Sequence, residues 1–238
     1  MAPIFSTRPL YLQLRDVLTE RIATGEWKAG VAIPNEGDLA REFGVSPGTM
    51  RKALGMMEGE RLVDRRQGRG TFVKDQGSED RTIRFSNIRG ADGMRISGAV
   101  TQAHITEGTA NDLECARLRL RVQDPVYRVR RVHSHEDRTF MIEDASMPAV
   151  LFPGLADSNG HSHRIAELAQ QHGMLLGKAE ERISIDQASP DIAEALGIAS
   201  ATPILLLDRV IETLGGRPVE WRLGRCHLAS DSYLAEMR

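Results

Sequence analysis

The segment from residue 33 to residue 73 constrains the fold of this chain more than any other part of it. An apolar pattern at helical spacing follows Pro34 and stops at Gly44, where a glycine closes helices well. A second helical pattern and a short glycine-rich basic run come directly after it. This order of helix, tight turn, helix and hairpin predicts a winged helix-turn-helix, a fold that enters DNA.

The second helix of this segment is predicted to begin at Pro47. Ser46 is a good N-cap, and a proline in the first helical position loses no hydrogen bond. Apolar residues then recur every three or four positions and mark the buried face: Met50, Ala53, Leu54 and Met57. The exposed first turns are left with small and polar residues, as in a recognition helix that faces the major groove.

Two further pieces complete this unit. A helix is predicted between Pro9 and Gly25, where one apolar stripe contains Leu10, Leu14, Val17, Leu18 and Ile22. Two strand-like runs, 62–64 and 71–73, flank a Gly-Arg-Gly sequence at 68–70. Glycines let a backbone approach a phosphate or the minor groove, and the arginines supply charge. Alone, the run fits an ordinary hairpin turn equally well, but its place after two helices favours a wing.

Residues 8–74 resemble the DNA-binding domain of GntR-type bacterial transcription regulators, with the pattern Gly-Val-Ser-x-x-Thr followed by Arg-x-Ala-Leu and Gly-x-Gly-Thr-Phe-Val. Many family members carry arginines where Gly37 stands and at or beside Pro47. The loss of one bidentate base contact changes discrimination by about 1–3 kcal/mol. The operator is therefore expected to differ from those of better-known members, and specificity is expected to depend on α-helical and wing residues that are retained.

The resemblance implies a set of DNA-binding residues in the two helices and the wing: Arg8, Glu36, Ser46, Gly48, Thr49, Arg51, Lys52, Arg66, Gln67, Gly68, Arg69, Gly70 and Thr71. The positive charge around them is modest. Residues 1–75 hold 12 Lys and Arg against 10 Asp and Glu, and the remainder holds 19 against 23. A reading domain this weakly basic needs a second copy for useful affinity, so we expect a homodimer on a pseudo-palindromic double-stranded DNA operator.

The chain is expected to have two domains, an N-terminal winged helix-turn-helix in 1–75 and a second domain in 89–238, joined by a polar linker in 76–88. No run is apolar enough to span a bilayer and the start lacks a signal-peptide pattern, so no membrane partner and a cytoplasmic location are expected. Cys115 and Cys226 are too few for a disulfide framework and are expected to fill the core as thiols.

The second half contains a weak internal repeat. In each copy a capped helical segment, at 109–116 and 189–197, precedes a proline and a predicted hairpin, at 126–147 and 204–228. Arg131 and Arg209 stand six residues after the prolines, and Glu143 and Glu220 stand in the two return strands. Duplicated hairpins are expected to pair into one antiparallel sheet with helices on one face, an α+β arrangement.

Strand parity singles out two charged residues. Arg131 shares a strand face with Tyr127 and Val129, and Glu143 is the charged member of an otherwise largely apolar row. A charge on the covered face of a sheet is costly unless it is paired or used by a ligand. From the residues alone, a structural salt bridge across the hairpin and a ligand site are equally open.

Residues 89–238 resemble the UTRA effector domain of the HutC subfamily, an α/β fold similar to chorismate lyase without its enzymatic role. The matching marks, in order, are residues 93–97, 127–132, Glu143, 151–155, 215–220 and Tyr233. The resemblance implies an effector pocket lined by Arg95, Ser97, Arg131, His133, Glu143, Ser162, His163, Glu220, Arg222 and Cys226.

Two of these positions depart from relatives that respond to sugar phosphates. His133 stands where such relatives often have a second arginine, and Cys226 stands where they often have a tyrosine, while Arg222 and Arg225 add positive charge. An arginine can fork a carboxylate, and a glutamate can accept from a hydroxyl or an amine. We therefore expect the effector to be a small acidic or zwitterionic molecule.

The sequence thus predicts a ligand-responsive transcription regulator, and specifically a repressor. An alternative is that the second domain retains a small-molecule enzyme activity beside the DNA binding. No serine or cysteine stands in an activating sequence context, so no catalytic residue is assigned. The His-x-His pairs at 133–135 and 161–163 lack a carboxylate or histidine at a spacing that completes a metal motif, and neither metal nor cofactor is expected.

Overall fold

The computed structural model describes residues 8–75, 87–96, 99–157 and 165–235, which divide into two compact units, 1–76 and 77–238. Most of the predicted linker lies outside the described residues, so the boundaries 1–75, 76–88 and 89–238 stay predictions. Among the described helices, none is long and apolar enough to cross a membrane.

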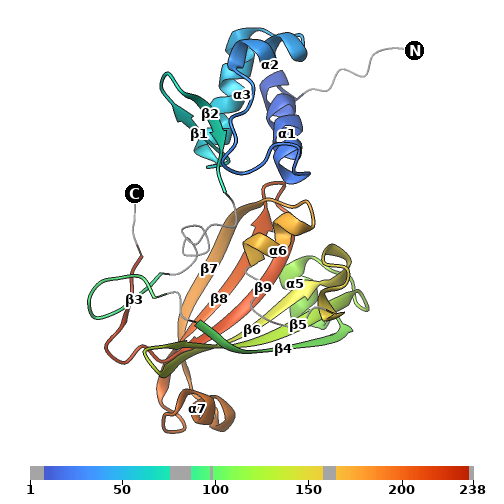
Figure 1. The fold of residues 1–238 in the computed structure, drawn as a ribbon. Helices are drawn as coiled ribbons and strands as arrows, with labels where there is room; N and C mark the ends of the chain where they lie inside the picture. The colour runs from blue at the N-terminus through green and yellow to red at the C-terminus, as the bar shows by residue number, and fades with distance from the viewer. Residues whose placement is uncertain (1–7, 76–86, 97–98, 158–164, 236–238) are drawn as a thin grey trace. The chain divides into compact units, whose positions relative to one another are not determined.

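The first unit contains three helices and a hairpin in the predicted order (Figure 1). These are α1 (Leu10–Ala23), α2 (Glu36–Glu42), α3 (Pro47–Gly59), β1 (Val63–Arg66) and β2 (Gly70–Val73). Asn35 caps α2, and the Ser46 hydroxyl caps α3 by accepting from the Thr49 amide at 3.2 Å. Gly44 ends the turn between them with a φ of +63°, which a glycine adopts without strain. The winged helix-turn-helix is confirmed.

The apolar stripe of α1 is narrower than its sequence pattern indicates. Leu14, Leu18 and Ile22 are buried, but Leu10 and Val17 are 51% and 43% exposed. The core of this unit is small, and α1 packs chiefly against α3, whose four predicted apolar residues are all buried. Leu14, Leu18 and Ile22, which are spaced one helical turn apart, form the buried row of α1, and Leu10 and Val17 remain exposed to solvent.

The second unit is built on one six-stranded antiparallel sheet with the order β4-β5-β6-β9-β8-β7. Its strands are β4 (Ala99–Thr109), β5 (Pro125–His135), β6 (Arg138–Pro148), β7 (Leu176–Gln187), β8 (Pro203–Thr213) and β9 (Pro218–Cys226). The two predicted hairpins are β5-β6 and β8-β9. They meet where β6 pairs with β9, which confirms the prediction that both copies join one antiparallel sheet.

The repeat is longer than its sequence pattern indicated. Each copy begins with a strand, so the order in one half is β4, α5 (Asp112–Leu118), β5 and β6, and in the other β7, α7 (Pro190–Leu196), β8 and β9. β4 and β7 are the two edges of the sheet. Both carry many exposed polar residues, and 182–187 of β7 are all exposed. Edge strands of this kind lack the apolar alternation by which buried strands are predicted.

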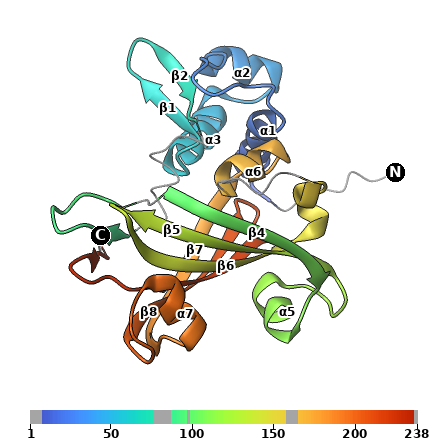
Figure 2. The same ribbon diagram turned by 60° about the horizontal axis from the view of Figure 1, so that its bottom comes forward.

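The helices lie on both faces of the sheet, so the expectation of one covered face is wrong (Figure 2). α5 and α7 pack on one face, through Ser146 and Ile142. α6 (Ile165–Gln171) packs on the opposite face with Val129 and Ala145, and Arg131 and Glu143 belong to that opposite face by strand parity. A small sheet of β3 (Ile88–Arg89) and β10 (Ser232–Tyr233) covers more of it through an apolar cluster that includes Ile88 and Cys226.

Glu114 fixes α5 to the sheet. It completes a capping box with Asn111, receives two hydrogen bonds of 2.7 Å from Arg128, and accepts from the Ser146 hydroxyl at 2.7 Å. The side chain is 1% exposed. One buried carboxylate therefore satisfies donors from three segments, which a substitution would leave without an acceptor.

Replacement of Glu114 by alanine should lower the free energy of unfolding by about 2–4 kcal/mol, because a cap is lost and buried donors are stranded. Urea denaturation of the full chain measures it. Asp112→Ala is the matched control, since Asp112 is an exposed acid on the same helix. Equal destabilisation by both substitutions would contradict this role.

Candidate functional site

The first candidate site is the exposed face of α3 with the β1-β2 hairpin. Arg51 is 67% exposed, and its Nη2 lies 2.7 Å from Glu36 Oε1 of α2. Arg65 of β1 approaches the same carboxylate, with Nη2 3.4 Å from Oε2. The hydrogen bond that Arg51 donates to Glu36 raises the pKa of Arg51 above its usual value. Glu36 thus links α2, α3 and the hairpin.

Other side chains that are predicted to contact DNA interact with residues of the same unit. The Lys52 ammonium lies 3.8 Å from the centre of the Tyr11 ring of α1. Arg66 lies over the Phe72 ring at 4.6 Å and hydrogen-bonds Asp64 at 3.0 Å, and Arg8 pairs with Asp16. These cations are held against neighbours, and each keeps part of its surface in solvent.

The turn of the β1-β2 hairpin is exposed to solvent along its whole length. Residues 67–70 are exposed, and Gly68 and Gly70 have φ values of +69° and +108°. A side chain at either position would be strained, so both glycines are required by the turn itself. The Ser46 and Thr49 hydroxyls lie 2.8 Å apart at the start of α3, beside exposed Gly48. Thr71 is the second residue of the return strand β2 and pairs with Arg65.

The second candidate site is a closed ring of two arginines and two glutamates on the α6 face of the sheet. Arg131 Nη1 lies 2.6 Å from Glu143 Oε1 and 3.4 Å from Glu220 Oε1. Arg222 Nη1 lies 3.0 Å from Glu143 Oε2, and Arg222 also pairs with Glu220. Each carboxylate therefore contacts both guanidinium groups, and we call these four residues the Arg-Glu ring.

The ring is almost fully removed from solvent. Glu143 and Glu220 are 3% and 0% exposed, and Arg131 is 6% exposed. Burial alone would raise the pKa of Glu143, but the Arg222 charge, the His133 side chain and the Arg131 charge hold it well below the ordinary value of 4.5. Two guanidinium groups face the two carboxylates, so the ring holds two positive groups against two acidic ones. The structure thus confirms the salt bridge across the hairpin that strand parity allowed, and the ligand site at the same residues stays a prediction.

Among the described residues, His133 stands next to the ring and neither of its nitrogens has a hydrogen-bond partner. It is 8% exposed, both nitrogens are buried, and Nε2 lies 3.8 Å from Glu143 Oε1, which is too long for a hydrogen bond. A buried polar group without a partner costs about 1–3 kcal/mol. Cys226 is fully buried in the neighbouring apolar cluster, and burial raises the pKa of its thiol.

A second ion pair extends the site along the sheet and was not predicted. Arg209, the repeat equivalent of Arg131, pairs with Glu181 of β7 at 2.6 Å. The Tyr233 hydroxyl donates to the same Glu181 and accepts from the Asn87 amide at 2.8 Å. Strand register places Glu181 opposite Arg209, and Arg209 opposite Arg222. Only knowledge of β7 could have identified this partner.

Three predicted effector residues, Ser97, Ser162 and His163, lie outside the described residues. Arg95 is exposed, in the turn that follows β3. The structure therefore brings six of the ten predicted effector residues together on one face of the sheet: Arg131, His133, Glu143, Glu220, Arg222 and Cys226. The presence of the other four beside them stays a prediction.

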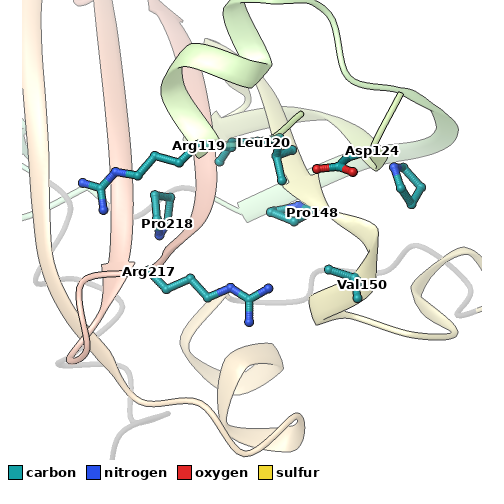
Figure 3. A pocket seen from close by; sticks show the side chains of 9 residues that line it. Arg119, Leu120, Asp124, Pro148, Val150, Arg217 and Pro218 are labelled. Carbon is teal, nitrogen blue, oxygen red and sulfur yellow. The ribbon is translucent and has the colours of Figure 1, made fainter. Parts of the chain in front are cut away.

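A cavity of about 490 Å³ lies elsewhere in this unit (Figure 3). It is lined by the end of α5, the start of β5 and the start of β9, and contains Arg119, Pro125 and Arg217. Arg119 is tied to Glu212 and to the Gly216 carbonyl, at 2.7 Å each. Pro125 and Arg131 are six residues apart on one strand, or roughly 20 Å. Pro218, which also lines the cavity, is two residues from Glu220 on β9, but none of the four ring residues lines the cavity itself.

Comparison with known proteins agrees with both units. Residues 10–73 match the profile of the bacterial regulatory proteins of the gntR family, and residues 99–230 match the UTRA domain. The chain belongs to the GntR family and carries a UTRA domain. It resembles the mannosyl-D-glycerate transport/metabolism system repressor MngR of Escherichia coli, with 31% identity over 202 residues, 83% of each chain.

Two other proteins are similar to this chain. The histidine utilization repressor of Pseudomonas putida is 27% identical over 213 residues, which cover 88% of this chain and 84% of that protein. The crystal structure of PhnF from Mycobacterium smegmatis matches with a TM-score of 0.55 and 23% identity, over 94% of this chain and 98% of that one. The latter likeness shows the shared fold.

The UTRA domain should lose stability in acid through the Arg-Glu ring. Because the folded pKa of Glu143 is depressed, its contribution is present above about pH 4.5 and is lost as the pH falls through the folded value. Glu143→Gln should cost about 3–5 kcal/mol at pH 7, because it leaves two buried guanidinium groups with one carboxylate.

Denaturant unfolding of the wild type and the Glu143→Gln variant between pH 7 and pH 3 measures this. The difference between the two proteins should shrink as the pH falls below 4.5. A constant difference over the whole range would show that Glu143 does not titrate in the way its charged surroundings demand.

Proposed function

We propose that this GntR-family regulator is a repressor that binds a pseudo-palindromic operator as a homodimer, and that a small molecule at the Arg-Glu ring modulates this binding. The observation that carries the proposal is that one chain contains both an exposed arginine on α3 and a largely buried Arg-Glu ring. Beside the ring lies a histidine that makes no hydrogen bond with the described residues. The relatives MngR and the histidine utilization repressor are repressors by name, which supports the direction of regulation.

A homodimer is supported by the weak charge of the first unit and by the free edge of the UTRA sheet. Residues 1–75 carry a small excess of positive charge, so one copy gains little from phosphate attraction. β7 is a twelve-residue edge strand with one unpaired side, and on it Ile183 and Ile185 are 44% and 78% exposed. An exposed edge strand of this length that carries two exposed isoleucines is suited to pair with a second copy of itself.

The effector is proposed to be acidic or zwitterionic. The ring offers two arginines to a carboxylate and two glutamates to an amine or hydroxyl, and His133 offers one donor and one acceptor. A ligand that hydrogen-bonds His133 removes the cost of leaving a buried imidazole unpaired. A thermal-shift screen of metabolites at fixed salt identifies such a ligand, because binding stabilises the folded chain by mass action.

We further propose that the UTRA domain acts without catalysis. The ring residues are paired with one another, and the two cysteines are unsuited to act as nucleophiles: Cys226 is buried, and burial raises the pKa of Cys115 as well. Incubation of the full chain with any ligand found in the screen, followed by mass spectrometry, should return the ligand unchanged. Turnover would favour a bifunctional protein.

Replacement of Arg51 by alanine should abolish sequence-specific operator binding, because it removes the exposed guanidinium of α3. Footprinting on the operator measures the loss, while sedimentation and ligand binding should remain as in the wild type. An unchanged footprint would exclude α3 as the recognition helix.

Replacement of Arg131 by alanine should remove the response to the effector while operator affinity is retained. Operator release or enhancement is measured with a ligand from the thermal-shift screen. Because the substitution leaves two buried glutamates with one arginine, Arg131→Lys is made in parallel as the better-tolerated variant. An unaltered ligand response in both variants would make Arg131 purely structural.

A further inference from the structure

Glu36 occupies an unusual position for an acid in a DNA-reading unit. It lies in the first turn of α2, and its carboxylate faces Arg51 of α3 and Arg65 of β1. A free carboxylate at this surface would repel the phosphate backbone. Both of its oxygens, however, are within reach of guanidinium groups, so its charge is compensated inside the protein.

The contact with Arg51 has a definite geometry. Arg51 Nη2 lies 2.7 Å from Oε1, and Arg51 Nε lies 3.3 Å from Oε2. Glu36 therefore engages one edge of the guanidinium plane with both oxygens. The described contacts of Arg51 do not involve Nη1, and a guanidinium reads guanine O6 and N7 through two parallel donors.

The relative exposure of the two groups supports this orientation. The Arg51 side chain is 67% exposed and the Glu36 side chain 26%, so the carboxylate lies beneath the guanidinium that it holds. An unrestrained arginine on a helix surface samples many rotamers, and ordering it on DNA costs conformational entropy. A guanidinium already held in place loses less on binding.

The Glu36 carboxylate also contacts Arg65. Arg65 belongs to β1, and its approach to Glu36 joins the hairpin to α2 and, through Arg51, to α3. The charge of both arginines is partly cancelled, which lowers their non-specific attraction to phosphates. The arrangement is expected to lower the affinity for DNA of any sequence and to increase the discrimination between operator and other sequences.

We propose that Glu36 is a positioning residue for operator recognition: it contacts no base, and it orients Arg51 to read one base pair while suppressing non-specific binding through Arg51 and Arg65. This inference rests on the proposed function, in which α3 is the recognition helix. It changes the role of Glu36 from a DNA contact to a support for one.

The test compares Glu36→Gln with Asp38→Asn in the full-length protein. Asp38 lies two residues away on the same helix, and its described partners are Asn35 and Arg41, so its substitution removes an equal charge without touching α3. Binding is measured on an operator selected from random DNA and on unrelated DNA of equal length, at several salt concentrations. Thermal unfolding verifies that both variants fold.

Glu36→Gln should lower operator affinity about tenfold and raise affinity for unrelated DNA about twofold to threefold, since one well-oriented base contact is lost and positive charge is uncovered. Asp38→Asn should change both affinities by the same small factor. If the two variants behave alike, Glu36 acts only as a bulk charge and the proposal is overturned.

A double substitution separates positioning from direct contact. If Glu36 acts through Arg51, the Glu36→Gln/Arg51→Ala protein should bind the operator no more weakly than Arg51→Ala alone. Additive losses would mean that Glu36 contacts the DNA itself, which overturns the proposal. Retention of specific binding by Arg51→Ala would instead refute α3 as the recognition helix, so failure of the proposed function is seen separately.

Discussion

Three buried charges and a largely covered fourth, Arg222, lie where the two halves of the UTRA sheet meet, and each carboxylate contacts both guanidinium groups. Glu143 comes from β6, Glu220 and Arg222 from β9, and Arg131 from the neighbouring β5. An uncompensated ion in such a place costs several kcal/mol, and removal of one partner exposes the rest to that cost. The pairing of β6 with β9 and the balance of these charges therefore depend on each other.

The two candidate sites hold arginines by the same chemistry in different surroundings. At the Arg-Glu ring the charges are buried, so pairing is a condition of folding. On α3 the Arg51–Glu36 pair is largely exposed, and an exposed pair contributes little to stability. In the proposed role, its effect falls on the orientation of the Arg51 side chain and on the charge that DNA meets. The same type of ion pair thus stabilises the fold in one unit and is proposed to support recognition in the other.

Much of the fold could be predicted from local signals. Ser46 and Pro47 define the start of α3, and the prolines and glycines around 125 and 216 delimit both hairpins. Strand alternation placed Arg131 and Glu143 on one buried face, which the structure confirms. The prediction that the helices cover only one face of the sheet was wrong, because the amphipathic pattern of a helix does not say which face of a sheet it covers.

The remaining contacts depend on strand order and register, which local patterns do not contain. Glu181 lies on β7, a polar edge strand without alternation, so its pairing with Arg209 could not be foreseen. Glu36 was expected to contact DNA because it stands in a family motif. Only the packing of α2 against α3 shows that its carboxylate faces Arg51.

The most direct test of this account is selection of random double-stranded DNA by the full-length protein, with and without a metabolite that stabilises it. The account predicts enrichment of an inverted repeat with half-site centres one helical turn or a multiple apart, and a change of that enrichment when the metabolite is present. Absence of any enriched sequence, or enrichment that no stabilising metabolite alters, would contradict it.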